Sequence, residues 1–155
     1  MTKVYLFDWG NTLMVDFPHS SGKMCDWTEV QAVESAEQVL AELSRNASIY
    51  VATGAADSTV GDIEKAFRRV GLDRYISGYF CQSNIGQPKG SPEFLIEILH
   101  RLGVAPKDAA MVGDNFEKDI APALTAGIKP IWLTAKLPTA PEGVEVIGSL
   151  WELLY

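Results

Sequence analysis

Residues 4–13 read VYLFDWGNTL, and this stretch decides the fold because an apolar run stops abruptly at Asp8. Four consecutive apolar residues are typical of a strand that is buried on both faces of a parallel sheet. Two further runs have the same form: residues 48–52 (SIYVA) stop at Thr53, and residues 109–112 (AAMV) stop before Gly113 and Asp114. Each of these predicted strands therefore delivers a polar side chain at its carboxyl end.

The intervals between these runs carry helical spacing of apolar residues and helix end signals. They predict helices at 28–46 (opened by a capping box from Thr28 to Gln31), 60–70, 92–102, from about 119 or 121 to 126, and 150–154. A weaker strand pattern occupies 78–82, further strands are expected at 128–133 and 144–147, and a loop or small hairpin is expected at 9–27. Strands that alternate with helices predict an α/β fold, Rossmann-like and three-layered around a mainly parallel sheet.

Length and composition bound the class of protein. The chain has 155 residues, which suits a single domain over 1–155, and its net charge of -7 disfavours nucleic acids and anionic membranes as partners. Two cysteines make no disulfide framework, and the sequence has no signal-peptide pattern and no apolar run of the ~20 residues that span a bilayer. We therefore expect a cytoplasmic protein.

Carboxylates gather at the predicted ligand-binding edge of the sheet. Open parallel sheets bind ligands beyond the carboxyl ends of their strands, where Asp8 and Asp114 are expected, with Asp119 shortly after. Two like charges ~4 Å apart repel by about 4 kcal/mol at an effective dielectric near 20, so such a cluster needs a cation. Mg²⁺ takes hard oxygen ligands and bridges carboxylates to phosphate, and a carboxylate such as Asp8 can attack phosphorus to form an aspartyl-phosphate.

Four polar signatures follow one another in a specific order. They are DWGNTL at 8–13, Thr53 after the second strand, Lys89 within QPKGSPEF at 87–94, and the Gly113-Asp114-x₄-Asp119 pattern. This order and spacing resemble the four motifs of the haloacid-dehalogenase-like (HAD) hydrolase superfamily over nearly the whole chain.

The resemblance implies a role for each of these residues. Asp8 would be the nucleophile, Lys89 would act beside it, and the Mg²⁺ ligands would be Asp8, the backbone carbonyl of Gly10, Asp114 and Asp119. Substrate would be bound by Thr53, Gly54, Lys89 and Asn115. The implied function is a Mg²⁺-dependent phosphohydrolase acting on a phosphorylated small molecule or a phosphoprotein.

The resemblance also implies the strand order 5-4-1-2-3. Only about 40 residues separate Leu13 from Thr53, and core elements fill the interval from Thr53 to Lys89, so we expect no cap domain, only a loop or flap at 14–27. Caps exclude water and select small substrates. Without one, the site would be open, or a homo-oligomer would cover it.

The first motif departs from the family pattern at Gly10, where most HAD phosphatases carry a second Asp that protonates the leaving oxygen. General acid–base help is typically worth about 10²–10⁴ in rate. Three interpretations stay open: a polar residue of the 14–27 loop replaces the acid, the substrate has a good leaving group such as an acyl phosphate, or the chain binds phosphoryl groups as a regulatory module without turnover. The loop candidates are Asp16, His19, Lys23 and Asp26.

Other branches and classes fit the sequence less well. Haloacid dehalogenases lack the second Asp but need no Mg²⁺, whereas this chain keeps the Gly-Asp-x₄-Asp pattern. Phosphonatases have a similar first motif but use a lysine from a cap domain. A receiver-like phosphorylation switch places its acidic pair early and its lysine last, whereas here the acidic pair follows Lys89.

Overall fold

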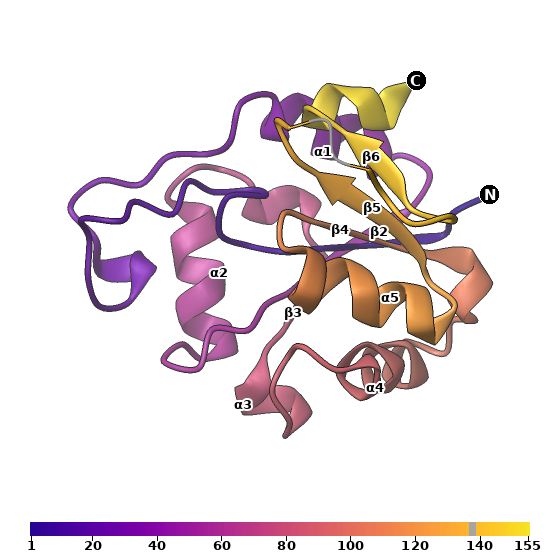
Figure 1. Ribbon diagram of the computed structural model, residues 1–155. Coiled ribbons are helices and arrows are strands. Elements are labelled where there is room, and N and C mark those ends of the chain that lie inside the picture. Colours follow the sequence, from indigo (N-terminus) through magenta and orange to yellow (C-terminus); the bar gives the residue numbers. More distant parts are fainter. Residues whose placement is uncertain (137–138) are drawn as a thin grey trace.

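A central parallel sheet lies between two layers of helices in the computed structural model, which describes residues 1–136 and 139–155 (Figure 1). Within those residues the sheet has the order β3-β2-β1-β4-β5-β6, and every neighbouring pair is parallel. The strands are β1 (Val4–Phe7), β2 (Ser48–Ala52), β3 (Gly78–Phe80), β4 (Ala109–Gly113), β5 (Lys129–Leu133) and β6 (Glu145–Ile147). The predicted order 5-4-1-2-3 is confirmed, with β6 added beyond β5.

Two layers of helices cover the sheet, one on each face (Figure 1). One layer contains α1 (Ala36–Leu43), α2 (Val60–Arg68) and the short helix η5 (Leu150–Leu154). The other contains α3 (Gln82–Ile85), α4 (Pro92–Leu102) and α5 (Ala121–Ala126). The remaining short helices are η1 (Met24–Asp26), η2 (Asp73–Tyr75), η3 (Pro106–Asp108) and the π-helix η4 (Phe116–Ile120).

The apolar runs of the central strands are buried on both sides. Leu6 and Met111 belong to the core beneath α4, whereas Phe7 and Val112 belong to the core beneath α1 and α2, and all four side chains are fully buried. Successive residues of a strand point to opposite faces, so continuous apolar runs are what a sheet covered twice requires. The prediction of an α/β fold with three layers is confirmed.

The predicted helix at 28–46 is wrong in its first half, because α1 begins only at Ala36. Residues 31–33 instead run beside residues 13–15: Val15 N donates to Gln31 O and Val33 N donates to Leu13 O, both at 2.8 Å. Met14, which is fully buried, forms an antiparallel bridge with Ala32. This long-range pairing satisfies the backbone that the capping-box pattern would have placed in a helix.

Smaller differences lie at element ends. The predicted strand 78–82 ends at Phe80, and the unpredicted α3 follows from Gln82. The helix around 119–126 is preceded by the π-turn of η4, and Pro122 lies in the first turn of α5, where a missing N–H costs nothing. In the described part of the chain, no helix combines the length and apolarity that crossing a membrane requires.

Candidate active site

The site lies where β1 and β4 end side by side, at the point where the chain's crossovers diverge to the two halves of the sheet. Asp8 follows β1 directly and Asp114 follows β4 directly. Asp8 N donates to Val112 O at 2.9 Å, which continues the β1–β4 pairing by one residue. The two carboxylates are therefore brought together by strand register.

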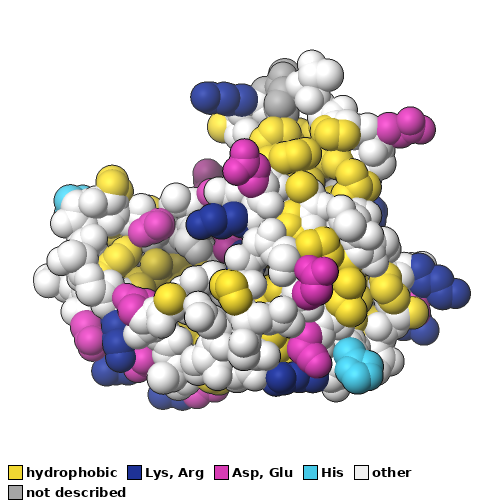
Figure 2. All heavy atoms as spheres, turned by 60° about the horizontal axis from the view of Figure 1, so that its bottom comes forward, with side chains coloured by type: hydrophobic (Ala, Val, Ile, Leu, Met, Phe, Trp, Pro, Cys, Tyr) yellow, Lys and Arg dark blue, Asp and Glu magenta, His cyan; other side chains and the backbone are white. Residues whose placement is uncertain are grey.

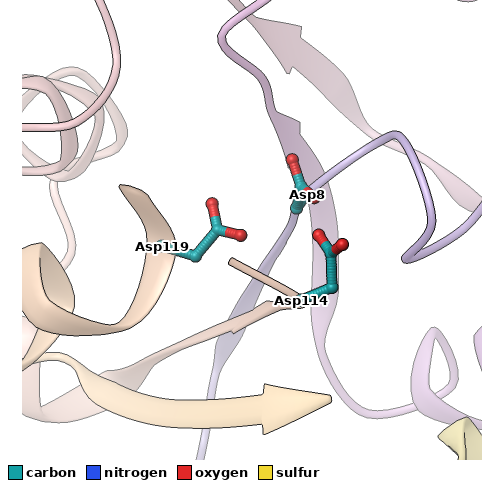
Figure 3. A group of neighbouring side chains, drawn as sticks. All are labelled: Asp8, Asp114 and Asp119. Carbon is teal, nitrogen blue, oxygen red and sulfur yellow. The ribbon is translucent and has the colours of Figure 1, made fainter. Parts of the chain in front are cut away.

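Three carboxylates converge at this edge (Figure 3). Asp8, Asp114 and Asp119 each offer an oxygen, and these oxygens all lie within 4.8 Å of one another. Figure 3 shows Asp119 reaching from its helical turn toward the other two side chains. The structure places these three residues together, as the sequence analysis predicted.

Asp119 is held by the turn that carries it. Its Oδ2 accepts a hydrogen bond from Asn115 N at 3.1 Å, and its side chain is 1% exposed. The chain at Gly113 passes so close that a Cβ there would lie 2.2 Å from Asp119 Oδ2, so no larger residue fits without movement. The turn itself is the π-helix η4, a wide geometry that is frequent at functional sites.

Lys89 lies between the carboxylates and is almost fully buried, at 3% exposure. Its Nζ donates to Asp8 Oδ1 at 2.8 Å and to Ala52 O at 2.9 Å, and lies 2.5 Å from Asp119 Oδ1. The contact with Asp119 is an ion pair that is not aligned as a hydrogen bond. The buried Asp119 Oδ1 therefore has no hydrogen-bond partner among the described residues. One lysine thus faces two carboxylates and fixes them to the end of β2.

Thr12 is a site residue to which the sequence analysis assigned no role. It is fully buried, and its Oγ1 donates to Asp8 Oδ2 at 3.1 Å and lies 3.5 Å from Asp114 Oδ1. Its place within the DWGNTL motif was the only available signal, since the sequence does not show that the turn after Asp8 folds back toward the carboxylates. Thr12 orients Asp8.

Burial and charge move the pKa values of the site in opposite directions. Burial alone would raise the pKa of Asp8, but the charge of Lys89 and the hydrogen bonds to the carboxylate together outweigh burial and hold that pKa below its usual range. Burial would lower the pKa of Lys89, and the charges of Asp8 and Asp119 raise it instead. Asp8 is therefore an ionised carboxylate beside an ionised lysine.

The other two carboxyl groups hold protons more tightly. Burial, together with the hydrogen bond and charge of Asp8, raises the pKa of Asp114 to about 7. Burial also raises the pKa of Asp119 to about 6, although Lys89 opposes the shift. These three carboxyl groups lie within reach of one ion, and Asp119 Oδ1 has no hydrogen-bond partner in the described part of the chain, so the cluster fits a hard divalent cation such as Mg²⁺.

Most of the residues proposed from the sequence line one open cavity of about 270 Å³. They are Asp8, Gly10, Gly54, Lys89, Asp114, Asn115 and Asp119, together with Asp16, one of the loop candidates for the acid, and with Asn11 and Lys118, which were not assigned to the site. Asn115 also caps η4, because its Oδ1 accepts from Lys118 N at 2.9 Å. Thr53 is buried, its Oγ1 accepts from Ala55 N at 3.2 Å, and it lines the adjoining cavity instead.

This second cavity, also about 270 Å³, adjoins the first at Gly10 and Asp16. Its walls include Trp9, Met24 and Trp27, so it is more apolar than the first. Figure 2 shows a hollow between the 14–27 loop and the body of the molecule, with hydrophobic side chains inside and acidic side chains at its edge. The two cavities together offer a charged end and an aromatic end.

The fold is a Rossmann-like α/β fold with three carboxylates at the ligand-binding edge of its parallel sheet. Residues 11–127 match the sequence model of the haloacid dehalogenase-like hydrolases, beginning just after Asp8. The chain therefore belongs to the haloacid dehalogenase-like hydrolase family.

Individual proteins are similar to this chain in sequence or in fold. A phosphoserine phosphatase from Thermus thermophilus is 38% identical over 73 residues, which cover 46% of this chain and 29% of that protein, so the chain spans less than a third of this relative. An uncharacterized protein from Listeria monocytogenes has the same fold, with a TM-score of 0.82 and 24% identity over 97% of this chain and 94% of that one. A HAD hydrolase from Bacillus subtilis, solved bound to magnesium, has a TM-score of 0.77 and 15% identity over 98% and 96% of the two chains.

The buried lysine yields a first prediction. Replacing Lys89 with Met should leave Asp8 and Asp119 without their buried cation and lower the free energy of unfolding by about 3–5 kcal/mol in EDTA. Mg²⁺ should recover part of this loss. Chemical denaturation with and without Mg²⁺ measures both effects, with Lys107→Met, at an exposed position, as the matched control. Equal stability of Lys89→Met and the control would contradict the ion-pair assignment.

The raised pKa values yield a second prediction. Because the folded-state pKa of Asp114 is about 7 and that of Asp119 about 6, against 3.8 when unperturbed, both groups stabilise the metal-free fold at low pH. That contribution is lost as pH rises through 6 to 7. In EDTA the melting temperature should fall between pH 5.5 and 8, on the order of 5 °C.

The controls for this experiment follow from the same residues. Asp114→Asn should flatten the pH dependence, whereas Glu142→Gln, at an exposed position, should leave it unchanged. Melting curves by circular dichroism at several pH values provide the measurement. A metal-free wild type that becomes more stable from pH 5.5 to 8 would show that the acidic pair does not carry these shifts.

Proposed function

We propose that this chain is a Mg²⁺-dependent phosphohydrolase that acts through an aspartyl-phosphate on Asp8. The observation that carries the proposal is the state of Asp8: an ionised carboxylate at the wall of an open cavity, paired with buried Lys89 and set among the oxygens of Asp114 and Asp119. The match to a phosphoserine phosphatase supports a phosphoryl substrate.

Asp8 is proposed as the nucleophile. One carboxylate oxygen of Asp8 would attack phosphorus. The bond between this oxygen and phosphorus would form as the bond between phosphorus and the leaving oxygen breaks. Lys89 keeps Asp8 ionised and places a positive charge beside the phosphoryl oxygens, while the hydrogen bond from Thr12 to Oδ2 fixes the carboxylate's orientation. Water would then release phosphate and restore Asp8.

The acidic cluster is the proposed Mg²⁺ site. Asp8, Asp114 and Asp119 would hold the ion together with the backbone carbonyl of Gly10, which lines the same cavity. The bound ion would neutralise the carboxylates and the charge of the phosphoryl group. The magnesium in the similarly folded Bacillus subtilis hydrolase supports this choice of metal.

The remaining polar groups around the cavity are proposed to bind phosphoryl oxygens. Gly54 and Asn115 line its wall, and the exposed Lys118 adds a second cation to that of Lys89. Thr53, on the adjoining cavity, would contact the substrate beside the phosphoryl group. A phosphorylated small molecule or phosphoprotein side chain would place its phosphoryl group in the charged cavity and its leaving group in the aromatic one.

Other features of the proposal remain predictions: a single core domain over 1–155 with the 14–27 loop as its flap, a cytoplasmic location, and a homo-oligomer as a possible cover for the open site. The cavity that adjoins the site is lined on one side by Gly22, Met24 and Trp27 of that loop. This position supports the assignment of the loop as a flap.

Asp8→Asn tests the proposed function. The amide keeps the shape of the side chain but cannot act as the nucleophile, so turnover of p-nitrophenyl phosphate and acetyl phosphate should fall by at least about 10³-fold. EDTA should abolish wild-type turnover and Mg²⁺ should restore it. Asp73→Asn, at a residue that lines neither cavity, serves as the matched control and should keep full activity.

Two outcomes would contradict the proposal. Turnover by Asp8→Asn close to that of wild type would exclude Asp8 as the nucleophile. Wild-type protein that binds phosphate in a Mg²⁺-linked manner by calorimetry, yet turns over neither substrate, would instead support the phosphoryl-binding module suggested by Gly10.

A further inference from the structure

We propose that Asp16 is the proton donor to the leaving oxygen and supplies the acid that the first motif lacks at Gly10. The inference rests on the proposed phosphohydrolase function and assigns one further catalytic residue to it. Four observations carry it: the space beside Gly10, the fold of residues 10–16, the place of Asp16 between the two cavities, and the engagement of the other loop candidates elsewhere.

The Asp16 side chain occupies the space into which a side chain at position 10 would extend. A Cβ built on Gly10 would lie 3.3 Å from Asp16 Cβ and 3.5 Å from Asp16 Oδ2. A carboxyl group is therefore present beside position 10, although it arrives from a residue six positions later in the chain. Gly10 leaves the room that the Asp16 side chain uses.

A tight, cross-braced turn brings Asp16 to this position. Asn11 adopts a left-handed backbone with φ of 60°, its N–H donates to Met14 O at 2.6 Å, and its Oδ1 accepts from Asp16 N at 2.9 Å. Gly10 and Met14 form a bridge, and buried Met14 also pairs with Ala32. The backbone of Asp16 is thus fixed relative to Gly10, as a catalytic side chain requires.

Asp16 also stands where the leaving group would pass. It lines both the cavity that holds Asp8 and the adjoining cavity lined by Trp9 and Trp27. Within residues 1–136 and 139–155 its carboxylate makes no hydrogen bond or ion pair, so its oxygens are available to a ligand. If the phosphoryl group lies at Asp8 and the leaving group lies in the aromatic cavity, the leaving oxygen between them would lie beside the Asp16 carboxyl group.

The other three acid candidates of the loop are engaged elsewhere. Lys23 donates to Asp62 Oδ2 at 3.0 Å, and Asp26 pairs with Lys65 at 3.7 Å. His19 packs on Phe17, with ring centroids 5.5 Å apart, and lines a separate cavity. None of the three lines either of the two cavities described above. Asp16 is therefore the member of the set that remains.

The proposed step balances as follows. Protonated Asp16 gives its proton to the leaving oxygen as the bond from that oxygen to phosphorus breaks and the Asp8–phosphorus bond forms, which releases an alcohol. In the second half-reaction, ionised Asp16 accepts a proton from the water that attacks phosphorus, the bond to Asp8 breaks, and phosphate leaves. The products are alcohol and phosphate, and water is the co-reactant.

Single-turnover release of the leaving group tests this role. With Mg²⁺ present and enzyme in excess, phenol release from phenyl phosphate and nitrophenol release from p-nitrophenyl phosphate report the first half-reaction alone. Asp16→Asn should slow release from phenyl phosphate by about 10²-fold, because phenolate is the poorer leaving group and needs the proton. Release from p-nitrophenyl phosphate should slow by less than about 10-fold.

Two further variants separate catalysis from loop structure. Asp26→Asn lies on the same loop outside both cavities and should change neither rate. The exchanged pair Gly10→Asp with Asp16→Gly returns a carboxyl to position 10 and removes the Cβ that would crowd it, so it should restore most of the phenyl phosphate rate. A residue that only supported the loop would not be replaced in this way.

The possible failures are distinguishable. Suppose that Asp8→Asn is inactive, and that Asp16→Asn slows leaving-group release from both substrates equally or from neither. The role of Asp16 is then overturned while the proposed function stands. If the wild type releases neither product, the proposed function fails and the role of Asp16 fails with it.

Discussion

Like charges that converge in a buried place repel, and the carboxyl edge of this sheet gathers three of them around one lysine. Lys89 contacts Asp8 and Asp119 from a position that is 3% exposed. The parallel pairing of β1 with β4 brings Asp8 and Asp114 together, because they follow the ends of neighbouring strands within one residue of the same level. The fold therefore places carboxylates where they repel one another, and the charge of Lys89 offsets only part of this repulsion. In the proposed function, a bound Mg²⁺ offsets the rest.

The strands could be predicted because the information is local, whereas their order came from the family resemblance. Continuous apolar runs such as VYLF and AAMV indicate strands that are buried on both faces. The alternation of strands with helices predicts that neighbouring strands pair in parallel. The helix expected at 28–46 failed because residues 13–15 compete for the backbone of residues 31–33, and such a long-range partner leaves no trace in a capping pattern. Short α3 was missed for a similar reason, since four residues carry too little periodicity.

The site divides along the same line. Asp8 and Asp114 follow directly from strand ends, whereas the inward position of Lys89 on an irregular segment came only from family resemblance. Thr12 and Asp16 depend on how the turn after Asp8 folds back, which rests on the positive φ of Asn11 and on hydrogen bonds to the chain beyond it. The sequence shows which residues follow the end of a strand, but it does not show where the conformation of a loop places the residues within it.

The π-turn of η4 has a consequence for how this site tolerates change in chain length. Asp119 N bonds to Asn115 O four residues back, and the five-residue bond of the π-turn follows it, from Ala121 N to Phe116 O; Asp119 lies against Gly113. Removing one residue between Asn115 and Asp119 would turn the Asp119 side chain away from its present direction, because each residue of an α-helix advances the side chain by roughly 100° around the axis. The third carboxylate would then swing out of the cluster, so this segment can vary in composition more freely than in length.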